Sequence, residues 1–237
     1  ADINLPYSDI ARDCLLKEGF PLDRIIKTGS PIFEVIQHFR AQIEKSDVLS
    51  RLKLQKNSYF VVSTHREENV DNPARLNMIF NTLNAVADGY GLPIIFSTHP
   101  RTAKRIEGGD FNIHPNITLM KPLGFLDYNA LQMSSLAVLS DSGTISEEAS
   151  ILRFRALNLR ETHERHEAME EGTVMMTGIS SERVLQCLEV LLSDEFKDRR
   201  SGLVADYSQP DVSDKVVKII FSYVSYVNRV VWGVSEC

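Results

Sequence analysis

The sequence predicts an α/β fold, a doubly wound parallel sheet with helices on both of its faces. Short apolar runs of strand length alternate with segments of helical periodicity, which is typical of βαβ units. Polar or charged residues directly follow four of these runs, as expected for binding loops at the carboxyl ends of parallel strands. The chain has 237 residues, 43% of them hydrophobic, so it can bury a sizeable core.

Each expected strand is a short apolar run bounded by polar or turn residues. The runs are residues 24–28, 58–63, 93–98, 116–120, 136–140, 155–159 and 173–176. A helix is expected after Asp71, a candidate N-cap, and another after Ser180, because apolar residues then recur at helical spacing. A longer pattern over residues 211–229 predicts an amphipathic helix, and the apolar tail that follows has no periodicity.

The charge balance excludes one class of partner. The chain has 26 Lys and Arg residues and 32 Asp and Glu residues, which gives a net charge of −6, and its pI is about 5.6. We therefore expect no nucleic acid held by a basic surface, although a single anionic small molecule can still bind a local cluster of arginines and histidines. No apolar run is long enough for a membrane helix, so no membrane partner is expected.

The cysteines and histidines predict no metal centre. Cys14, Cys187 and Cys237 have the spacing of neither a metal site nor a disulfide framework, and reduced thiols in a cytoplasmic protein explain them best. The chain also lacks a Gly-x-Gly-x-x-Gly fingerprint. The sequence therefore predicts no metal and no dinucleotide cofactor.

The four polar loops begin after expected strands, and parallel pairing brings such strand ends to one edge of a sheet. Their first residues are Thr64, His99, Asp141 and Arg160. A single polar loop says little, but four at one edge predict a functional site there. His65 is a strong candidate because it directly follows a buried run.

Ordinary structural roles explain other residues of these loops. His99 precedes Pro100, so a structural turn is as good an explanation as a functional role. Glu67 and Glu68 are explained equally by surface ion pairs with Arg66 or Arg101. The sequence does not separate a cleft position from a surface position for His163 and His166.

Residues 140–149, Ser-Asp-Ser-Gly-Thr-Ile-Ser-Glu-Glu-Ala, form the most informative segment. Ser142, Gly143 and Thr144 are expected on a tight turn from strand to helix, where free N–H groups and the helix dipole suit a phosphate. Glu148 lies about one turn further along the same face, where its carboxylate can accept hydrogen bonds from a ribose diol. An ordinary N-cap at Ser142 or Thr144 explains this segment equally well.

Several motifs in register resemble one enzyme family. They are Thr-His-Arg-Glu-Glu at residues 64–68, Ser-Asp-Ser-Gly at 140–143, Glu-Glu at 147–148 and Arg-Glu-Thr-His-Glu-Arg-His-Glu-Ala-Met-Glu at 160–170. Over residues 9–192, their order and gaps resemble those of the non-hydrolysing UDP-N-acetylglucosamine 2-epimerases of bacterial surface-polysaccharide synthesis. Separate motifs in register are more specific than one glycine-rich loop.

The resemblance implies a domain arrangement. The family has two Rossmann-like domains that face a cleft, the GT-B fold, and this chain resembles the C-terminal half. Residues 1–30 are then the lead-in and crossover from a missing N-terminal domain, residues 31–205 the nucleotide-binding domain, and residues 206–237 a helix and tail that pack on the missing domain. The family is cytoplasmic and often forms homodimers, largely through the first domain, so a cytoplasmic location is implied and a homodimer is one open possibility for this chain.

The resemblance also implies a reaction and the residues for it. The family inverts C2 of a UDP-N-acetylhexosamine by eliminating UDP and adding it back, without a metal or cofactor. First-domain carboxylates are thought to take part, so this chain alone is expected to bind UDP weakly and not to turn over. His65 would be catalytic, since a donor there stabilises charge on the leaving phosphate oxygen. The implied UDP-binding residues are Arg66, Ser142, Gly143, Thr144, Glu148 and Arg165.

Two departures from the family pattern concern the sugar. Thr144 stands where most members have a second glycine, and residues 160–167 differ from the common Arg-Asp-Thr-Thr-Glu-Arg-Pro-Glu. The combination is closer to the branch that forms UDP-N-acetyl-L-fucosamine. Two alternatives remain: a GT-B glycosyltransferase, which shares the nucleotide half-site, and a non-catalytic nucleotide-sugar-binding domain.

Overall fold

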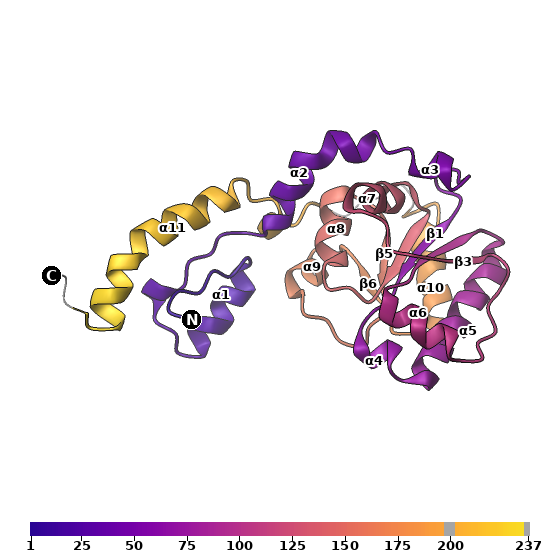
Figure 1. Cartoon of the computed structure of the whole chain (residues 1–237), viewed down its shortest axis with the longest axis horizontal. Helices are drawn as coiled ribbons and strands as arrows, with labels where there is room; N and C mark the ends of the chain where they lie inside the picture. The colour runs from indigo at the N-terminus through magenta and orange to yellow at the C-terminus, as the bar shows by residue number, and fades with distance from the viewer. Residues whose placement is uncertain (197–201, 235–237) are drawn as a thin grey trace. The chain divides into compact units, whose positions relative to one another are not determined.

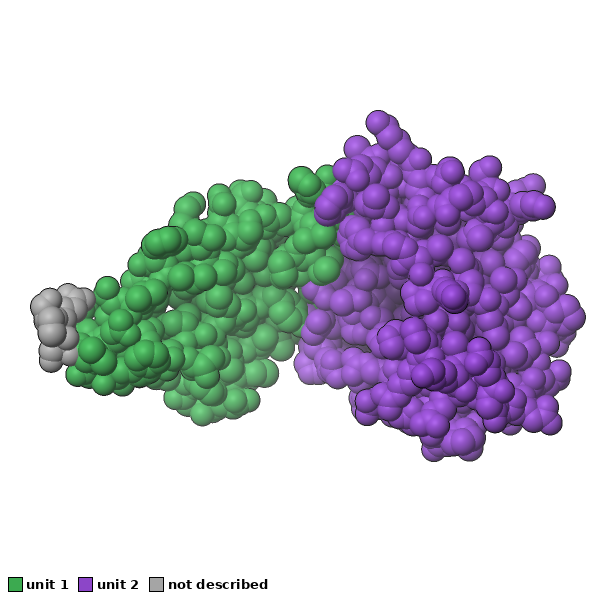
Figure 2. Space-filling model, viewed as in Figure 1, with its two compact units in different colours: residues 1–38, 203–237 green, residues 39–202 purple. Residues whose placement is uncertain are grey.

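The computed structural model describes residues 1–196 and 202–234, so Cys237 lies outside the described residues. The chain divides into two compact units, one of residues 39–202 and one of residues 1–38 with 203–237 (Figure 2). The larger unit holds the sheet and all the predicted site residues. That residues 1–30 and 206–237 adjoin a further domain stays a prediction.

The larger unit is built on a six-stranded sheet of order β3-β2-β1-β4-β5-β6. Every neighbouring pair is parallel, which confirms the predicted doubly wound sheet. The strands are β1 (Phe60–Ser63), β2 (Ile94–Ser97), β3 (Ile117–Met120), β4 (Ala137–Ser140), β5 (Ala156–Asn158) and β6 (Met175–Met176). The strand order reverses between β1 and β4, which lie side by side.

The register places the strand ends level with one another. Ser63, the last residue of β1, pairs with Ser97 of β2 on one side and with Ser140 of β4 on the other. The loops after these strands therefore leave the sheet at the same height, which is the physical basis for a shared site at this edge.

Helices cover both faces of the sheet (Figure 1). On one face, α5 and α10 share an apolar cluster with the strands, in which Phe80 and Leu188 pack with Phe60 and Phe96. On the other face lie α7 and α8. The helices of this unit are α3 (Val48–Arg51), α4 (Glu67–Val70), α5 (Pro73–Tyr90), α6 (Pro100–Glu107), α7 (Phe125–Ser134), α8 (Ile145–Leu152), α9 (His166–Glu170) and α10 (Ser181–Leu192), after α2 (Pro31–Glu44), which contains the unit boundary.

Two details of the sequence prediction are wrong. Asn72, not Asp71, caps α5: its side chain accepts from the backbone N–H groups of Ala74 and Arg75, while Asp71 pairs with Arg101. Residues 24–28 are not a strand of the sheet, because they belong to the smaller unit and form only an isolated bridge between Ile25 and Asn4 among the described residues.

The smaller unit is helical and small. It contains α1 (Asp9–Lys17), the short 3₁₀ helices η1 (Leu22–Arg24) and η2 (Ala205–Tyr207), and α11 (Val212–Tyr226), which continues into the short π-helix η3 (Val227–Val231). The predicted amphipathic helix is thus confirmed. Lys27 joins its parts through Asp9 at 2.6 Å and Asp206 at 2.9 Å.

Gly29 is required in this unit for two reasons. Its φ of +89° is a conformation that residues with a side chain rarely adopt, and a Cβ there would lie 2.4 Å from Cβ of Gln209.

Over the described ranges, none of the helices combines the length and the apolar character that a membrane crossing demands.

Candidate functional site

The loops after β1 and β4 meet where the strand order reverses, and one buried carboxylate joins them. Asp141, directly after β4, accepts hydrogen bonds from the backbone N–H of His65 at 3.0 Å and of Arg66 at 3.1 Å, and from Nδ2 of Asn69 at 2.9 Å. Its Oδ1 also lies 3.4 Å from Nδ1 of His65. Asp141 therefore fixes the start of the His65 loop against the start of the Ser142 loop.

A second contact between loops involves Arg66 and the segment after β5. The Arg66 guanidinium lies 3.3 Å from a carboxylate oxygen of Glu164, and the buried Arg160 bonds the other oxygen at 3.2 Å. These two arginines hold the pKa of Glu164 below its usual value, with the Arg160 hydrogen bond as the largest cause. A Cβ built on Gly143 would lie 3.4 Å from Arg66, so the glycine leaves room for this guanidinium beside the turn.

The turn from β4 to α8 has the predicted position. Ser142, Gly143 and Thr144 lie between the end of β4 and the first residue of α8, Ile145. Thr144 occupies the N-cap position, but within the described part of the chain no side chain makes the capping hydrogen bond. The N-cap explanation for Ser142 or Thr144 is therefore wrong in its usual form, because both hydroxyls are directed elsewhere.

These hydroxyls form a chain that reaches Glu148. Oγ of Ser142 lies 3.0 Å from Oγ1 of Thr144, and the Thr144 side chain hydrogen-bonds to Glu148. Gln132 of α7 donates to the other side of this network, with Nε2 3.0 Å from Oε2 of Glu148. The Glu148 carboxylate is thus held in one orientation beside the turn.

Burial changes the titration of Glu148. Loss of solvent raises its pKa above the ordinary glutamate value, the hydrogen bonds from Gln132 and Thr144 act in the opposite direction, and the negative charge of Glu147 adds to the rise. Tyr128 of α7 lies nearby, hydrogen-bonded to Ser63, and its pKa is also raised, chiefly by burial.

Arg165 lies beside the first turn of α8. Its guanidinium is 3.4 Å from Oε2 of the buried Glu147. His163 and His166 face each other, with 3.3 Å between their Nδ1 atoms, and His166 is exposed. The segment after β5 thus brings one arginine and two imidazoles to the same edge of the sheet.

His99, Glu67 and Glu68, at the same edge, each contact other protein groups. Nδ1 of His99 accepts from the backbone N–H of Arg101 at the start of α6, which is the turn explanation for this histidine. Glu67 pairs with Arg101 at 2.7 Å, and Glu68 lies 3.8 Å from Arg160. The surface ion-pair explanation for Glu67 is confirmed.

The structure adds residues that the sequence prediction did not select. Asp141 and Glu164 both lie inside motifs, directly beside selected residues, so position at a strand end could have found Asp141. Gln132 and Tyr128 had no such signal, because they lie on α7 and reach Glu148 only through the packing of α7 beside α8.

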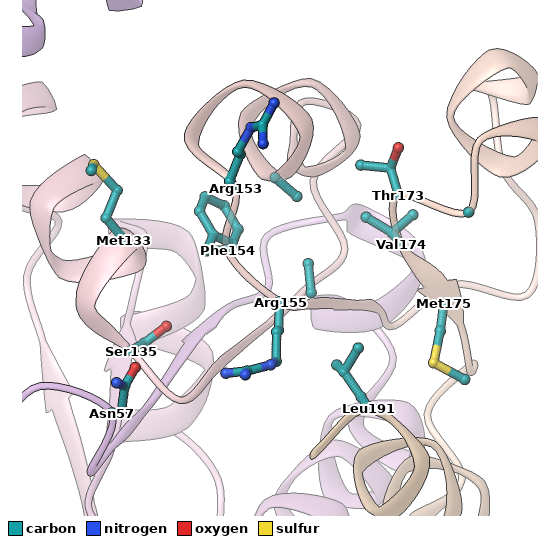
Figure 3. A pocket seen from close by; sticks show the side chains of 13 residues that line it. Asn57, Met133, Ser135, Arg153, Phe154, Arg155, Thr173, Val174, Met175 and Leu191 are labelled. Atoms are coloured by element: carbon teal, nitrogen blue, oxygen red, sulfur yellow. The ribbon is translucent and has the colours of Figure 1, made fainter. Parts of the chain in front are cut away.

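A separate cavity of about 70 Å³ lies at the opposite, amino-terminal edge of the sheet (Figure 3). Its lining comes from residues just before strands, such as Asn57, Ser135, Arg155 and Val174. Figure 3 shows the side chains of Arg153 and Arg155 pointing in opposite directions. This cavity is not part of the candidate site.

The chemistry of the site suits a diphosphate ester. Arginines 66, 160 and 165 supply positive charge, the start of α8 supplies a dipole, Ser142 and Thr144 supply hydroxyls, and Glu148 supplies an acceptor for a diol. Across residues 1–196 and 202–234, no three side chains of His, Cys, Asp or Glu gather in an arrangement that could hold a metal ion.

The sheet order and its solved neighbours define the class: the chain has the Rossmann-like α/β fold of GT-B proteins. The family model for UDP-N-acetylglucosamine 2-epimerase matches residues 1–221. The chain therefore belongs to the UDP-N-acetylglucosamine 2-epimerase family.

Solved structures agree with this assignment. The UDP-N-acetylglucosamine 2-epimerase of Rickettsia bellii is 41% identical with a TM-score of 0.87, over 98% of this chain and 62% of that one. A Methanocaldococcus jannaschii UDP-GlcNAc 2-epimerase, solved in complex with UDP-GlcNAc and UDP, is 28% identical with a TM-score of 0.82, over 94% and 61% of the two chains.

Curated relatives belong to the same family and show how much of their length this chain spans. The M. jannaschii UDP-N-acetylglucosamine 2-epimerase is 31% identical over 195 residues, which are 78% of this chain and 53% of the relative. A Methanococcus maripaludis relative of the same name is 32% identical over 82% of this chain and 57% of its own length. The chain thus spans little more than half of these relatives.

Proposed function

We propose that this chain is the UDP-binding half of a UDP-N-acetylhexosamine 2-epimerase. The observation that carries the proposal is the turn from β4 to α8, which has no side-chain cap among the described residues and lies beside Arg66, Arg165 and Glu148. A helix start with arginines beside it suits a diphosphate, and Glu148 one turn later suits a ribose. Solved relatives that are named as UDP complexes support the choice of nucleotide.

Each site residue has a proposed role in holding UDP. Ser142 and Gly143 bind the pyrophosphate with hydroxyl and backbone donors, and Thr144 orients Glu148 through the hydroxyl chain. Glu148 accepts from the ribose hydroxyls. Arg66 and Arg165 have electrostatic roles, because their positive charges balance the negative charge of the diphosphate.

The proposed reaction breaks the bond between C1 of the sugar and the oxygen of UDP. A proton leaves C2, a double bond forms between C1 and C2, and the electron pair of the broken bond stays on the phosphate oxygen. His65 and the arginines stabilise that oxygen. UDP then adds back to C1 as a proton returns to C2 on the opposite face, which needs an acid and a base on opposite sides of the ring.

We place those acid–base groups in a first domain that this chain does not contain. The chain covers only 53% and 57% of its first two curated relatives. The smaller unit has a groove of about 480 Å³, lined by apolar side chains that include Ile220, Tyr223 and Trp232, and such a surface fits packing against a further domain. On this proposal the chain alone binds UDP but does not turn over.

Calorimetry with UDP tests the binding half of the proposal. We expect the chain to bind UDP, and Glu148→Ala to weaken binding by about 1–3 kcal/mol through loss of charge-assisted hydrogen bonds to the ribose. Glu189→Ala, which removes an exposed glutamate of α10, is the matched control and should bind as the parent does. Equal affinities for all three proteins would refute the ribose role.

The sugar is tested by exchange in D₂O. We propose the branch that forms UDP-N-acetyl-L-fucosamine, from the departures at Thr144 and residues 160–167. The protein with its first domain is incubated separately with UDP-N-acetylglucosamine and with UDP-2-acetamido-2,6-dideoxy-L-talose, and proton NMR follows C2. Deuterium at C2 of the dideoxy-L-talose substrate alone supports this branch. Deuterium at C2 of UDP-N-acetylglucosamine overturns the branch and makes UDP-N-acetylglucosamine the substrate. No exchange in either substrate rejects the epimerase proposal.

A further inference from the structure

Asp141 is a carboxylate with no exposed surface, placed by the end of β4 at the point where the strand order reverses. A buried carboxylate is costly unless several donors satisfy it. Its hydrogen-bond donors among the described residues come from the segment that follows β1: the backbone N–H groups of His65 and Arg66, and the side chain of Asn69 in α4. The carboxylate is therefore built to hold that loop.

The His65 ring lies against the same carboxylate. Its Nδ1 is 3.4 Å from Oδ1 of Asp141, while 45% of its side chain is exposed. In an imidazole the two nitrogens lie on different sides of the ring, so Nε2 is directed away from Asp141. Hydrogen bonds in ligand-free sites are often long and shorten when substrate binds, so 3.4 Å is compatible with a working contact.

We propose that Asp141 is a positioning residue that fixes the His65 ring, with Nδ1–H directed to its carboxylate and Nε2 directed to the substrate. The carboxylate accepts from Nδ1–H whether the ring is neutral or charged, so Nε2 is the nitrogen that can gain or lose a proton without a turn of the ring. That Nε2 meets the UDP diphosphate rests on the proposed function; the tautomer and the ring orientation do not.

Other charges near the ring do not replace this contact. Arg66 follows His65 in the chain, but its guanidinium hydrogen-bonds to Glu164 in the segment after β5. From the neighbouring strand, Asp141 is the acidic group that reaches both the backbone and the ring of His65. One residue thus sets the position of the loop and the orientation of its imidazole.

Nitrogen-15 NMR of the histidine rings tests the proposal on this chain. The spectrum is recorded without ligand and with UDP, at about pH 8.5, above the ordinary histidine range. His65→Gln assigns the ring among the six histidines. We expect His65 to carry its proton on Nδ1 in the parent, and Asp141→Asn to move the population toward Nε2–H. Glu147→Gln, which changes another buried carboxylate at this edge, should leave the His65 ring unchanged.

The outcomes separate this inference from the proposed function. A His65 ring with its proton on Nε2 in the parent, with and without UDP, overturns the role of Asp141, and so does an unchanged ring in a folded Asp141→Asn. If Asp141→Asn does not fold, the parent spectrum decides. Calorimetry reports UDP binding independently, so a failure of the nucleotide proposal leaves the ligand-free result valid.

Discussion

The two units differ in how far they bury the apolar side chains of their helices. Phe80 of α5, in the larger unit, has no exposed surface, whereas Phe221 of α11, in the smaller unit, is 84% exposed. Both are phenylalanines on amphipathic helices. The difference teaches that a helical pattern predicts the helix but not its burial, which depends on whether a partner surface is present.

The partner surface of the larger unit is its sheet. Alternate residues of each strand point to opposite faces, so Phe60 and Val62 face α5 while Val61 faces the other side. In the smaller unit no sheet is present among the described residues, and Ile220 and Val224 remain more than half exposed. Four predictions test this contrast.

The largest expected effect is in the sheet core. Phe80→Ala removes a ring that packs beside Phe96, at 6.0 Å between ring centroids, and leaves a cavity. We expect the free energy of unfolding to fall by about 3–5 kcal/mol, as measured by urea denaturation followed by circular dichroism. If the variant does not fold, Phe80→Leu should show a smaller loss; a loss under about 1 kcal/mol for Phe80→Ala would contradict the packing.

The second effect is a dependence of stability on pH. It is expected because the candidate site buries a titratable carboxyl group, that of Glu148, whereas the core cluster of the sheet is made of hydrophobic side chains. Burial raises the pKa of Glu148 above 4.5. The folded state then keeps this proton to higher pH than the unfolded state, so stability falls as pH rises from about 4.5 toward the raised value. We expect Glu148→Gln to lose this decline. Urea denaturation at several pH values measures it, and an identical pH dependence in parent and variant would count against burial as the cause.

The third effect is local to the start of α5. Asn72→Ala removes the side chain that accepts from the N–H groups of Ala74 and Arg75. We expect a loss of about 1 kcal/mol in the free energy of unfolding, typical of an N-cap. Asn72→Asp keeps the acceptor and should stay close to the parent. A larger loss for Asn72→Asp than for Asn72→Ala would show that the cap is misassigned.

The smallest effect is expected on α11. Phe221→Ala makes the same change as Phe80→Ala, but at an exposed position. We expect the free energy of unfolding of this chain to change by no more than about 0.5 kcal/mol. Fluorescence of Trp232, the single tryptophan, adds a probe that lies in the smaller unit. A loss comparable to that of Phe80→Ala would mean that Phe221 is covered in solution.

Much of the fold was predictable because it rests on local patterns. Six of the seven expected strands are in the sheet, since short apolar runs between helical segments have few alternative structures. The strand predicted at residues 24–28 was wrong because, in the part of the chain that the structure describes, Ile25 forms an isolated bridge with Asn4 and joins no sheet. Pairing depends on which segments meet, and the local pattern does not show this. Asp71 and Asn72 are both good N-cap residues, and Pro73 at the start of the helix is a sequence signal that favours Asn72, the residue directly before it.

The site was predictable in its loops but not in its contacts. Sequence position alone brought residues 65, 66 and 142–144 to one edge, because parallel strands share a carboxyl end. The roles of Asp141 and Gln132 were not predictable. Asp141 bonds a loop more than 70 residues away in the chain, and Gln132 reaches Glu148 through helix packing.

The sequence by itself determined the alternation of strands and helices, the parallel sheet and the family, because apolar spacing and motif order are local or linear properties. The tertiary structure alone decided that Asp141 binds the His65 loop, that Thr144 and Gln132 orient Glu148, and that Phe221 is exposed while Phe80 is buried. The physical reason is that hydrogen-bond partners and burial depend on which distant segments meet, and only the packed chain fixes that.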